Sequence, residues 1–325
     1  MYFRIFKLNI LKYWGVNREM TKIFIDGSAG TTGLQIHDRL SKRKDIQLLT
    51  ISDEKRKDNA ARKELFAEAD IVFLCLPDAA AIEAVSLAHK DTVLIDTSTA
   101  HRVSEAWTYG FPELTGRREK IKTSRRIANP GCHAIGFIAL IAPLVENKIL
   151  SPESRLTCFS LTGYSGGGKQ MIAEYEAPAR EALLEAPRQY ALSQSHKHLP
   201  EMMKECGLKS APLFSPIVAP YYSGMEVTVP LHRDSLNSGI ESIKEVYHSY
   251  YQDGVVHFRE NSGESGFLSA GAFSGRDDME LAVWGNEERI LLTARFDNLG
   301  KGASGAAVQN MNLVMGTSEF EGLNL

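Results

Sequence analysis

The amino-acid sequence predicts an α/β protein in which a doubly wound parallel sheet is followed by an α+β unit with a mixed or antiparallel sheet. Before about residue 150, short runs of Val, Ile and Leu alternate with helical segments, which is typical of a parallel sheet covered on both faces. Beyond that point apolar residues alternate with polar ones, as in strands with one face in water. With 325 residues and 43% hydrophobic content, the chain is long enough for two globular units.

The first half begins with a strand, a glycine-rich turn and a helix in "KIFIDGSAGTTGLQIHDRL", where Leu34 and Leu40 recur near helical spacing. Three more buried strands are expected in "DIQLLTI", "ADIVFLCLP" and "DTVLIDTS", and a helix in "AAAIEAVSLAHK". Because strands and helices alternate along the chain, we expect the strands to be parallel.

The second half contains strands of another kind, in "RLTCFSLTG", "MEVTVPLHR" and "RILLTARFDN". The tail "KGASGAAVQNMNLVMG" then predicts a helix with Ala307, Met311, Val314 and Met315 on one face. A helix so rich in small residues can approach its neighbours closely, so we expect it to pack back onto the first unit.

Composition excludes several classes of function. A formal net charge of −3 leaves no broad basic field for nucleic acid, and no stretch approaches the roughly 20 apolar residues of a membrane span. The four cysteines are scattered without a CxxC pair, which argues against a disulfide framework or structural zinc and fits a reducing cytoplasm. Residues 1–19 are basic and partly apolar without a cleavage site, so we interpret them as a poorly ordered extension before a start at Met20, with a weak targeting segment as the alternative.

The turn "GSAGTTG" indicates a dinucleotide site. Gly27, Gly30 and Gly33 follow a strand and open a helix, where glycine lets the backbone approach a pyrophosphate and the helix N-terminus offers free N–H groups. The spacing GxxGxxG is less common than GxGxxG, and a tight turn without a ligand is the alternative.

The next strand ends in "TISDEKRKDNAAR", which should reach the adenosine ribose. There Asp53 would suit a 2′-hydroxyl, whereas Ser52, Lys55 and Arg56 would suit a 2′-phosphate. The residues alone leave both interpretations open, beside a third in which this run is an ordinary solvated segment.

The stretch "RIANPGCHAIGFIALIAPL" contains a candidate nucleophile. A turn signal precedes Cys132, and the apolar run after it predicts a helix that Pro143 should kink. A thiol at a helix N-terminus is expected to have a lowered pKa and a raised nucleophilicity. The remaining cysteines are expected to be ordinary core residues: Cys75, Cys158 and Cys206.

A thiolate mechanism needs a proton partner, and "SQSHKHLPEM" offers His196 and His198 within one short segment. Alternate residues of an extended segment share a face, so both imidazoles could reach one cleft, while Glu201 could orient one of them or hold a substrate amine. A metal site is the alternative, but the sequence shows no obvious third ligand.

Two further stretches could contact ligands. In "DTSTAHR", Ser98 and Arg102 follow the end of a parallel strand, where such sheets bind ligands, and Arg102 would suit a phosphate or carboxylate. The glycines of "TGYSGGGK" permit a close approach of the backbone to a cofactor or substrate, with a mobile surface loop as the alternative.

Seven motifs in a fixed order identify a family resemblance. They are "GSAGTTG", "DTSTAHR", "GFPE", "NPGCH", "TGYSGGGK", "HKHLPE" and "KGASGAAVQNMN". From about Met20 to the C-terminus the chain resembles the N-acetyl-gamma-glutamyl-phosphate reductase family of arginine biosynthesis, and more closely its shorter, type 2 form. That family is part of the aspartate-semialdehyde dehydrogenase-like superfamily.

The resemblance implies a cytoplasmic oxidoreductase that reduces an acyl phosphate to an aldehyde with NADPH, without a metal and as a homo-oligomer (dimer or tetramer). It implies a Rossmann-type NADP-binding domain formed by residues 20–131 and 300–325, and an α+β catalytic and dimerisation domain formed by residues 132–299. Residues 1–19 have no counterpart in the family.

Carried over by position, Cys132 would be the acylated thiolate, His196 the acid/base and Arg102 a phosphate ligand, with His198 and Glu201 beside them. The implied substrate and phosphate residues also include Ser98 and Asn129. The implied cofactor contacts are Gly27, Ser28, Ala29, Gly30, Thr31, Thr32, Gly33, Ser52, Lys55, Arg56, Ser165, Gly166, Gly167 and Asn312. The family's preference for NADP favours the 2′-phosphate interpretation of the "TISDEKRK" segment.

Three other functions fit part of these observations. Aspartate-semialdehyde dehydrogenase is similar in the nucleotide loop, the catalytic cysteine and the closing helix, but the residues of the motifs "HKHLPE" and "NPGCH" argue against it. A cysteine hydrolase would also use a Cys and a His, yet it gives no role to "GSAGTTG". A non-catalytic NADP sensor would bind the cofactor without turnover.

Overall fold

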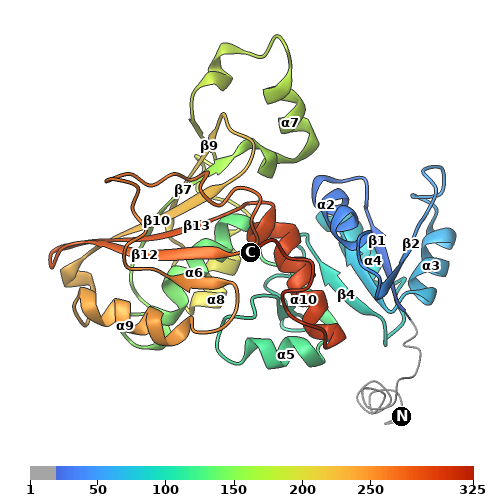
Figure 1. Cartoon of the computed structure of the whole chain (residues 1–325), viewed down its shortest axis with the longest axis horizontal. Coiled ribbons are helices and arrows are strands. Elements are labelled where there is room, and N and C mark those ends of the chain that lie inside the picture. The colour runs from blue at the N-terminus through green and yellow to red at the C-terminus, as the bar shows by residue number, and fades with distance from the viewer. Residues whose placement is uncertain (1–19) are drawn as a thin grey trace.

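The computed structural model describes residues 20–325, so the expected extension over residues 1–19 lies outside the described residues. Two sheets organise this part of the chain, and helix α10 (Gly305–Met315) lies between them in Figure 1. The predicted fold class, a parallel-sheet domain joined to an α+β domain with a mixed sheet, is confirmed. In the described part of the chain, each helix is too short or too polar to cross a membrane.

Sheet A is a six-stranded parallel sheet with the order β2-β1-β3-β4-β6-β5. Its strands are β1 (Thr21–Asp26), β2 (Ile46–Leu49), β3 (Ile71–Leu74), β4 (Val93–Asp96), β5 (Thr108–Tyr109) and β6 (Arg126–Ala128), and the helices of this region are α2 (Thr31–Leu40), α3 (Asn59–Glu68), α4 (Asp78–Val85) and α5 (Arg117–Thr123). Every residue of β3 and β4 is buried, as their continuous apolar sequence predicts. From β1 the chain turns to β2 on one side and then to β3 on the other, and such a reversal opens a ligand crevice at the carboxyl ends of the strands.

Sheet B has seven strands in the order β11-β12-β13-β10-β7-β9-β8 and is mixed, because β7 pairs with β9 and β11 with β12 in parallel while the other pairs are antiparallel. Its strands are β7 (Thr157–Gly163), β8 (Arg188–Gln189), β9 (Leu213–Ala219), β10 (Met225–His232), β11 (Val256–Phe258), β12 (Met279–Gly285) and β13 (Arg289–Phe296). The helices beside them are α6 (Cys132–Glu146), α7 (Gly168–Glu176), α8 (Leu199–Cys206) and α9 (Ile240–Tyr250). Helix α7 belongs to a lobe that projects from the rest of the domain (Figure 1).

Helix α6 is the central helix of the second domain and is buried from His133 to Leu144. Pro143, where the sequence predicts a kink, lies inside this helix, which continues without a break to Glu146. Proline removes the N–H that would bond to the carbonyl four residues earlier. That carbonyl, of Ala139, instead accepts a hydrogen bond from the Tyr251 hydroxyl at 2.7 Å, so the helix loses no partner there.

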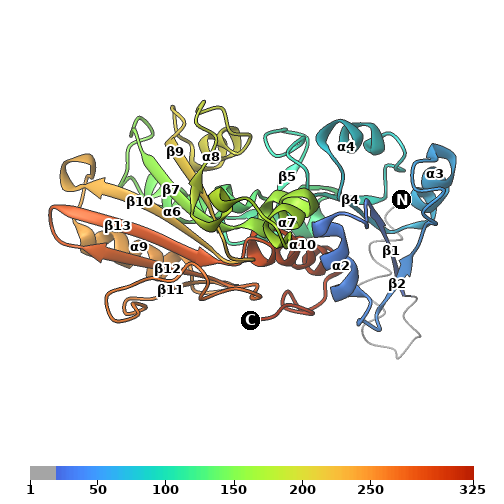
Figure 2. The same ribbon diagram turned by 90° about the horizontal axis from the view of Figure 1, so that it is seen from above.

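The C-terminal helix α10 packs back onto sheet A, as predicted. Ala307 and Met311 are buried in one cluster with residues of sheet A, and Val314 and Met315 pack against its edge. Seen from above, α10 lies between the two sheets and next to α2 (Figure 2). A π-helical turn over Gly300–Ser304, which the sequence does not predict, leads into the helix.

Candidate active site

Cys132 is the first residue of α6 and lies beyond the carboxyl end of β6. Its neighbour Gly131 is the N-cap in an extended conformation (φ −80°, ψ 145°), and the first intrahelical bond runs from the Ile135 N–H to the Gly131 carbonyl at 2.9 Å. A Cβ on Gly131 would lie 2.3 to 2.6 Å from side-chain atoms of Arg102, Glu201 and His198, so a larger residue before the thiol would displace them. The strand and the helix therefore place this cysteine at the crevice edge of sheet A.

Glu201, from the first turn of α8, ties this turn to two other side chains. Its Oε1 accepts from Arg102 Nη1 at 2.7 Å, and its Oε2 accepts from the Tyr109 hydroxyl at 2.7 Å and from the Gly131 N–H at 3.1 Å. The sequence interpretation, in which Glu201 orients an imidazole or holds a substrate amine, is thus corrected. Because its oxygens are already engaged by an arginine, a phenol and a backbone amide, this carboxylate holds the loop in front of Cys132.

Arg102 reaches the same loop but is not a free anion ligand in this structure. Its Nε donates to the Asn129 carbonyl at 2.9 Å and its Nη2 to the Thr97 carbonyl at 3.0 Å, in addition to the ion pair with Glu201. The side chain is buried, and a Cβ on Gly131 would come within 2.3 Å of its Nη1. The positive charge of Arg102 therefore lies beside Cys132, while its N–H groups hold the backbone carbonyls of Asn129 and Thr97.

The other predicted phosphate residues also have structural partners. The Ser98 hydroxyl donates to Asp96 Oδ2 at 2.8 Å. Asn129 donates from Nδ2 to the Ala303 carbonyl at 3.0 Å, and its own N–H bonds to the Asp96 carbonyl at 2.7 Å. Both residues lie at the carboxyl edge of sheet A, as predicted for Ser98, but their polar atoms support the loops there.

Three imidazoles gather next to the cysteine. The ring centroids of His133 lie 5.7 Å from His196 and 5.6 Å from His198, and those of His196 and His198 lie 4.7 Å apart. His133, which the sequence analysis missed, is held at both ring nitrogens, by Ser160 Oγ at 2.7 Å and by the Tyr190 hydroxyl at 2.6 Å. Its place in "NPGCH" was the available signal. Within residues 20–325, no group of three or more His, Cys, Asp or Glu side chains is arranged to hold a metal ion.

The two predicted histidines differ in their surroundings. His198 is buried, and burial together with the Arg102 charge holds its pKa well below the ordinary value. Its Nδ1 finds no hydrogen-bond partner in the described part of the chain, while its Nε2 packs against Gly131. His196 is half-buried, accepts the His198 backbone N–H at Nδ1 over 3.2 Å, and has its pKa lowered to about 4, chiefly by burial.

The four cysteines lie where the sequence predicts, but the pKa of Cys132 is not lowered as predicted. Burial raises the pKa of the Cys132 thiol, and the nearby Arg102 charge opposes this effect without overcoming it. The predicted lowering by the helix N-terminus is thus corrected for this structure, because removing the thiolate from water is the larger effect. Cys158 and Cys206 are buried in the core, as expected, and Cys75 is partly buried beside sheet A with its pKa raised by burial to about 12.

The glycine-rich loop after β1 is tightly packed against β3. A Cβ on Gly27, which has a φ of +90°, would lie 2.2 Å from the Cys75 carbonyl oxygen, and a Cβ on Gly33 would lie 2.5 Å from the Gly27 carbonyl oxygen. Thr31, the first residue of α2, has a buried hydroxyl for which residues 20–325 supply no hydrogen-bond partner. An orphaned hydroxyl at a helix N-terminus, with unbonded N–H groups around it, fits a phosphate group.

The second glycine-rich stretch faces this loop. It forms a 3-10 turn over Tyr164–Gly167, and a Cβ on the following Gly168 would lie 4.0 Å from Thr31 Oγ1. Ser165 is buried and accepts from Asn298 Nδ2 at 2.9 Å. The structure therefore brings the predicted cofactor residues around Gly166 and Gly167 next to those of the α2 N-terminus.

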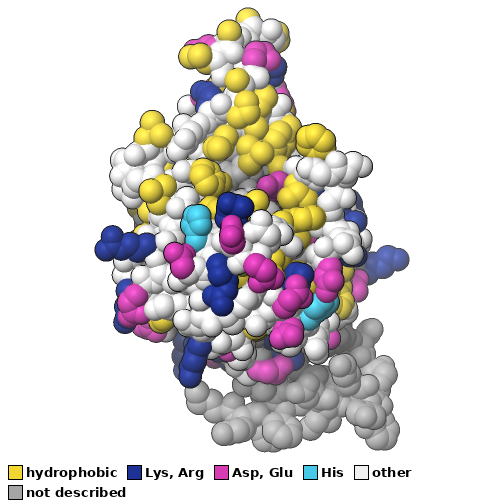
Figure 3. Space-filling model, turned by 90° about the vertical axis from the view of Figure 1, so that its left-hand side faces the viewer, with side chains coloured by type: hydrophobic (Ala, Val, Ile, Leu, Met, Phe, Trp, Pro, Cys, Tyr) yellow, Lys and Arg dark blue, Asp and Glu magenta, His cyan; other side chains and the backbone are white. Residues whose placement is uncertain are grey.

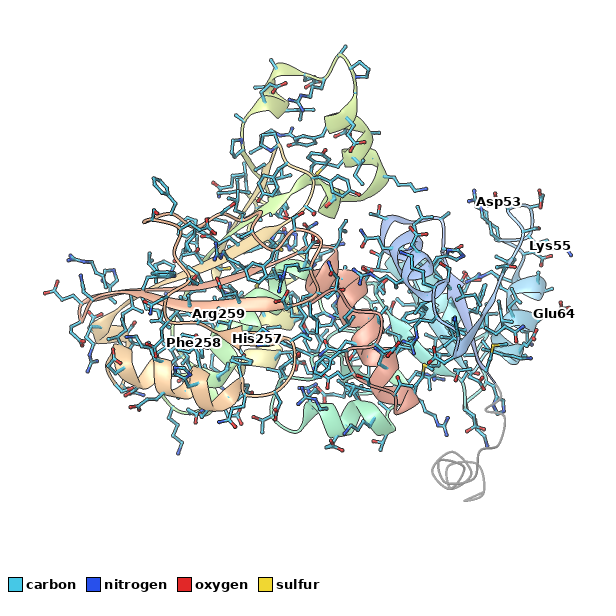
Figure 4. All side chains as sticks on the ribbon, in the orientation of Figure 1. Asp53, Lys55, Glu64, His257, Phe258 and Arg259 are labelled. Atoms are coloured by element: carbon cyan, nitrogen blue, oxygen red, sulfur yellow. The ribbon has the colours of Figure 1, made fainter. Side chains whose placement is uncertain are left out.

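Two groups of predicted cofactor residues lie away from the α2 N-terminus and the turn at Tyr164–Gly167. The segment with Asp53 and Lys55 is an exposed loop between β2 and α3, at the outer end of sheet A (Figure 4). Asp53 pairs loosely with Arg56 at 3.7 Å. The predicted contact at Asn312 is corrected, because this buried side chain donates to the carbonyls of Glu319 and Glu321 and accepts from Arg43.

Two family models match the sequence. Residues 17–124 match the model described as "Semialdehyde dehydrogenase, NAD binding domain", and residues 132–298 match "Semialdehyde dehydrogenase, dimerisation domain". The boundary between the two matches falls just before Cys132. The nucleotide loop and the cysteine helix thus belong to different matched units.

Similar curated proteins cover nearly the whole chain. It is 45% identical over 319 residues to an N-acetyl-gamma-glutamyl-phosphate reductase of Trichormus variabilis, covering 93% of this chain and 99% of that protein. It is 46% identical over 305 residues to the protein of the same name from Rhizobium etli, covering 90% and 98%. Among solved structures, aspartate semialdehyde dehydrogenase II of Vibrio cholerae matches with a TM-score of 0.69 at 15% identity, over 92% of this chain and 99% of that one. At this identity the structural match shows the fold alone.

Proposed function

This chain belongs to the N-acetyl-gamma-glutamyl-phosphate reductase family of oxidoreductases, and from this membership we propose that it reduces N-acetyl-glutamyl 5-phosphate through a thioester on Cys132. The products are N-acetyl-glutamate 5-semialdehyde and inorganic phosphate, as arginine biosynthesis requires. One observation carries the choice of residue: Cys132 begins a buried helix at the point where Arg102, Glu201 and His198 meet at Gly131. In this proposal residues 20–131 and 300–325 bind the cofactor, and residues 132–299 carry the chemistry.

The proposed reaction has two chemical stages. The thiolate attacks the acyl carbon, so that a C–S bond forms and the bond from that carbon to the phosphate oxygen breaks. The resulting thioester accepts a hydride much more readily than a carboxylate does. The tetrahedral adduct then collapses, which releases the aldehyde and restores the thiolate.

The residues around Cys132 support each stage in this proposal. The fixed charge of Arg102 favours the thiolate over the thiol and attracts the anionic substrate. The N–H groups in the first turn of α6, which lack intrahelical partners, stabilise the oxyanion of each tetrahedral adduct. His196 donates or accepts the proton that these adducts exchange. Glu201 accepts hydrogen bonds from Gly131 and Arg102 and so holds both in place.

A nicotinamide cofactor follows from family membership, and the residues present fit one. When bound, the nicotinamide supplies the hydride. The α2 N-terminus with its orphaned Thr31 hydroxyl suits the pyrophosphate, and the turn at Ser165–Gly167 closes the opposite side. We propose NADP as the cofactor, with Ser52, Lys55 and Arg56 close to the 2′-phosphate.

We predict that NADPH is preferred over NADH by about 10- to 100-fold in kcat/KM, which is the worth of one or two charge-assisted hydrogen bonds. Replacing Lys55 and Arg56 together by alanine should reduce this ratio to near one, mainly by raising the KM for NADPH. Lys57→Ala, in the same exposed loop, is the matched control. Equal efficiency of the wild type with both cofactors would contradict the assignment.

The proposed substrate is tested by running the reaction in reverse. The protein is incubated with phosphate, NADP and either N-acetyl-glutamate 5-semialdehyde or aspartate 4-semialdehyde, and reduction of the cofactor is followed by absorbance. Efficient turnover with the first aldehyde and weak turnover with the second supports the proposal. The opposite order would indicate an aspartate-semialdehyde dehydrogenase, and tight cofactor binding without turnover would indicate a sensor.

A homo-oligomer is part of the proposal, and the open face of sheet B supports it. Residues on this face alternate with buried ones along much of β7 and β10 and at the start of β13. Three of its apolar side chains are exposed: Phe159 (46%), Leu213 (57%) and Leu291 (43%). Figure 3 shows hydrophobic side chains gathered on this end of the molecule, from the projecting lobe downward. The match of residues 132–298 to a dimerisation domain points to the same region.

We predict that Phe159→Asp combined with Leu291→Asp converts the oligomer into a monomer, because two desolvated carboxylates in an apolar interface oppose association. Light scattering coupled to size-exclusion chromatography measures the molar mass. Ile82→Asp, an equally exposed apolar residue on α4 of the other domain, is the control and should leave the mass unchanged. An unchanged mass of the double variant would place the interface elsewhere.

We propose the cytoplasm as the compartment, since the four cysteines are free thiols.

A further inference from the structure

The π-helical turn over Gly300–Ser304 packs against the backbone and Cβ of Cys132. A Cβ on Gly302 would lie 3.0 Å from the Cys132 Cβ and 3.4 Å from its Cα, so the backbone of Gly302 packs directly on the cysteine. The Gly302 N–H bonds to the Asp297 carbonyl at 2.9 Å, and the Ala303 carbonyl accepts from Asn129 two residues before Gly131. A shift of this turn would therefore move Cys132 or its preceding loop.

The residue before Gly302 is a completely buried lysine. Lys301 Nζ lies 2.9 Å from each carboxylate oxygen of Glu113 and 2.6 Å from Gln309 Oε1, so its three donors all have acceptors. The Gln309 amide closes the ring by donating to Glu113 Oε1 at 2.9 Å. Glu113 belongs to "GFPE" of the first domain, whereas Lys301 follows the last strand of sheet B.

This network pairs a buried amine with a buried carboxylate, and burial lowers the pKa of Lys301 although Glu113 opposes this effect. Burial by itself would raise the pKa of Glu113, but the adjacent Lys301 ammonium and the Gln309 amide hold it below its ordinary value. A buried charge without its partner is strongly destabilising, so the pair must stay together in the folded chain. Because Lys301 directly precedes Gly302 in the turn, its pairing with Glu113 links the position of Gly302 to that of Glu113. π-helical turns are rare, and those that occur are frequently found at functional sites.

We propose that the Lys301–Glu113 ion pair is a positioning device that acts through Gly302 to fix Cys132 for attack on the acyl group. Neither side chain touches substrate or cofactor in this assignment. The inference rests on the proposed role of Cys132 as nucleophile and adds the residues that aim it.

The decisive test neutralises the pair without leaving a lone charge. Glu113→Gln combined with Lys301→Met keeps side-chain size while removing both charges. We expect kcat to fall on the order of 100-fold, the usual effect of a misplaced reacting group, with little change in the affinity for NADPH. The rate of Cys132 alkylation by iodoacetamide, followed by mass spectrometry across a pH series, should change in midpoint and in plateau, since the thiol leaves its place beside Arg102.

Two comparisons separate positioning from plain stability. Arg295 and Glu280 form another buried ion pair, at 2.7 Å between β13 and β12, and Arg295 also pairs with the exposed Glu264 at 2.6 Å. Arg295→Met with Glu280→Gln is the control. This control should lower Tm to a similar extent while leaving the Cys132 alkylation profile at its wild-type midpoint. Gly302→Ala leaves the Lys301 pair intact and crowds Cys132 directly, so it should reproduce the loss of kcat and the altered alkylation even if the double variant fails to fold.

The results discriminate between the two proposals. If the folded double variant keeps the wild-type alkylation profile and kcat, the positioning role of the pair is wrong, whatever Gly302→Ala does. If Gly302→Ala keeps both, the contact of Gly302 with Cys132 does not position the thiol, and the proposal is wrong as well. Equal changes in the Arg295/Glu280 control would also overturn it, because any loss of stability would then produce them. If instead Cys132→Ser retained turnover, the proposed nucleophile itself would be wrong. The alkylation series does not test this point, because it reports only the reactivity of the thiol.

Discussion

Cys132→Ser is expected to lower the rate of reduction by about 10⁴-fold or more, as the loss of a covalent nucleophile usually does. A serine hydroxyl at the start of α6 ionises far less than a thiol, and Arg102 cannot compensate for that difference. The oxygen ester that it could form also accepts hydride less readily than a thioester. Binding of NADPH should be unaffected, because the proposed pyrophosphate site at Thr31 belongs to the other domain.

The measurement combines NADPH oxidation in the presence of the acyl phosphate with the Kd for NADPH from its fluorescence. Cys158→Ser and Cys206→Ser are the controls, since both cysteines are buried in the core and neither lies at a helix N-terminus. These controls should lose stability but keep kcat. Near-normal turnover of Cys132→Ser would exclude the covalent mechanism.

The sequence predicted the fold well because periodicity depends on local chain geometry. Continuous apolar runs such as "IVFL" indicate strands buried on both faces, and alternation such as "MEVTVPLH" indicates strands with one open face. The C-terminal helix was also predicted to return to sheet A, from its small residues around Ala307. The π-helical turn before it was not, because five residues of this sequence contain no signal that distinguishes a π-helix from the start of an α-helix.

The sequence singled out several residues that the structure brings together, but it could not predict the contacts between them. Cys132, Arg102 and Glu201 all meet at Gly131, yet the pairing of Arg102 with Glu201 joins residues 99 positions apart and leaves no local pattern. The same holds for Lys301 and Glu113. The raised pKa of Cys132 could not be predicted either, because desolvation depends on the packing around the thiol, whereas the helix N-terminus can be read from the sequence.

His196→Asn is expected to lower kcat by about 10²- to 10⁴-fold, the usual worth of general acid–base catalysis, with little change in the affinity for NADPH. His196 is half-buried and can exchange protons with solvent, whereas His198 is buried. Its Nδ1 accepts the His198 N–H, so the neutral ring carries its proton on Nε2 and can offer it to the oxygen of a tetrahedral adduct. His198→Asn should act mainly on KM or Tm, since its ring fills the space against Gly131.

The pH profile separates these two histidines. Burial lowers the pKa of His196 to about 4, so in the free enzyme the ring stays neutral above that pH and becomes charged below it. Protonation places an N–H on Nδ1 and so breaks the bond from the His198 N–H that orients the ring. The limb that His196 contributes to kcat/KM should therefore lie near pH 4 rather than near 6.5, with activity lost as the pH falls through it. That limb should vanish in His196→Asn and persist in His198→Asn. His248→Asn, which changes an exposed imidazole on α9, should keep both the limb and kcat. If the large loss of kcat and the missing limb both appeared in His198→Asn, the roles of the two histidines would have to be exchanged.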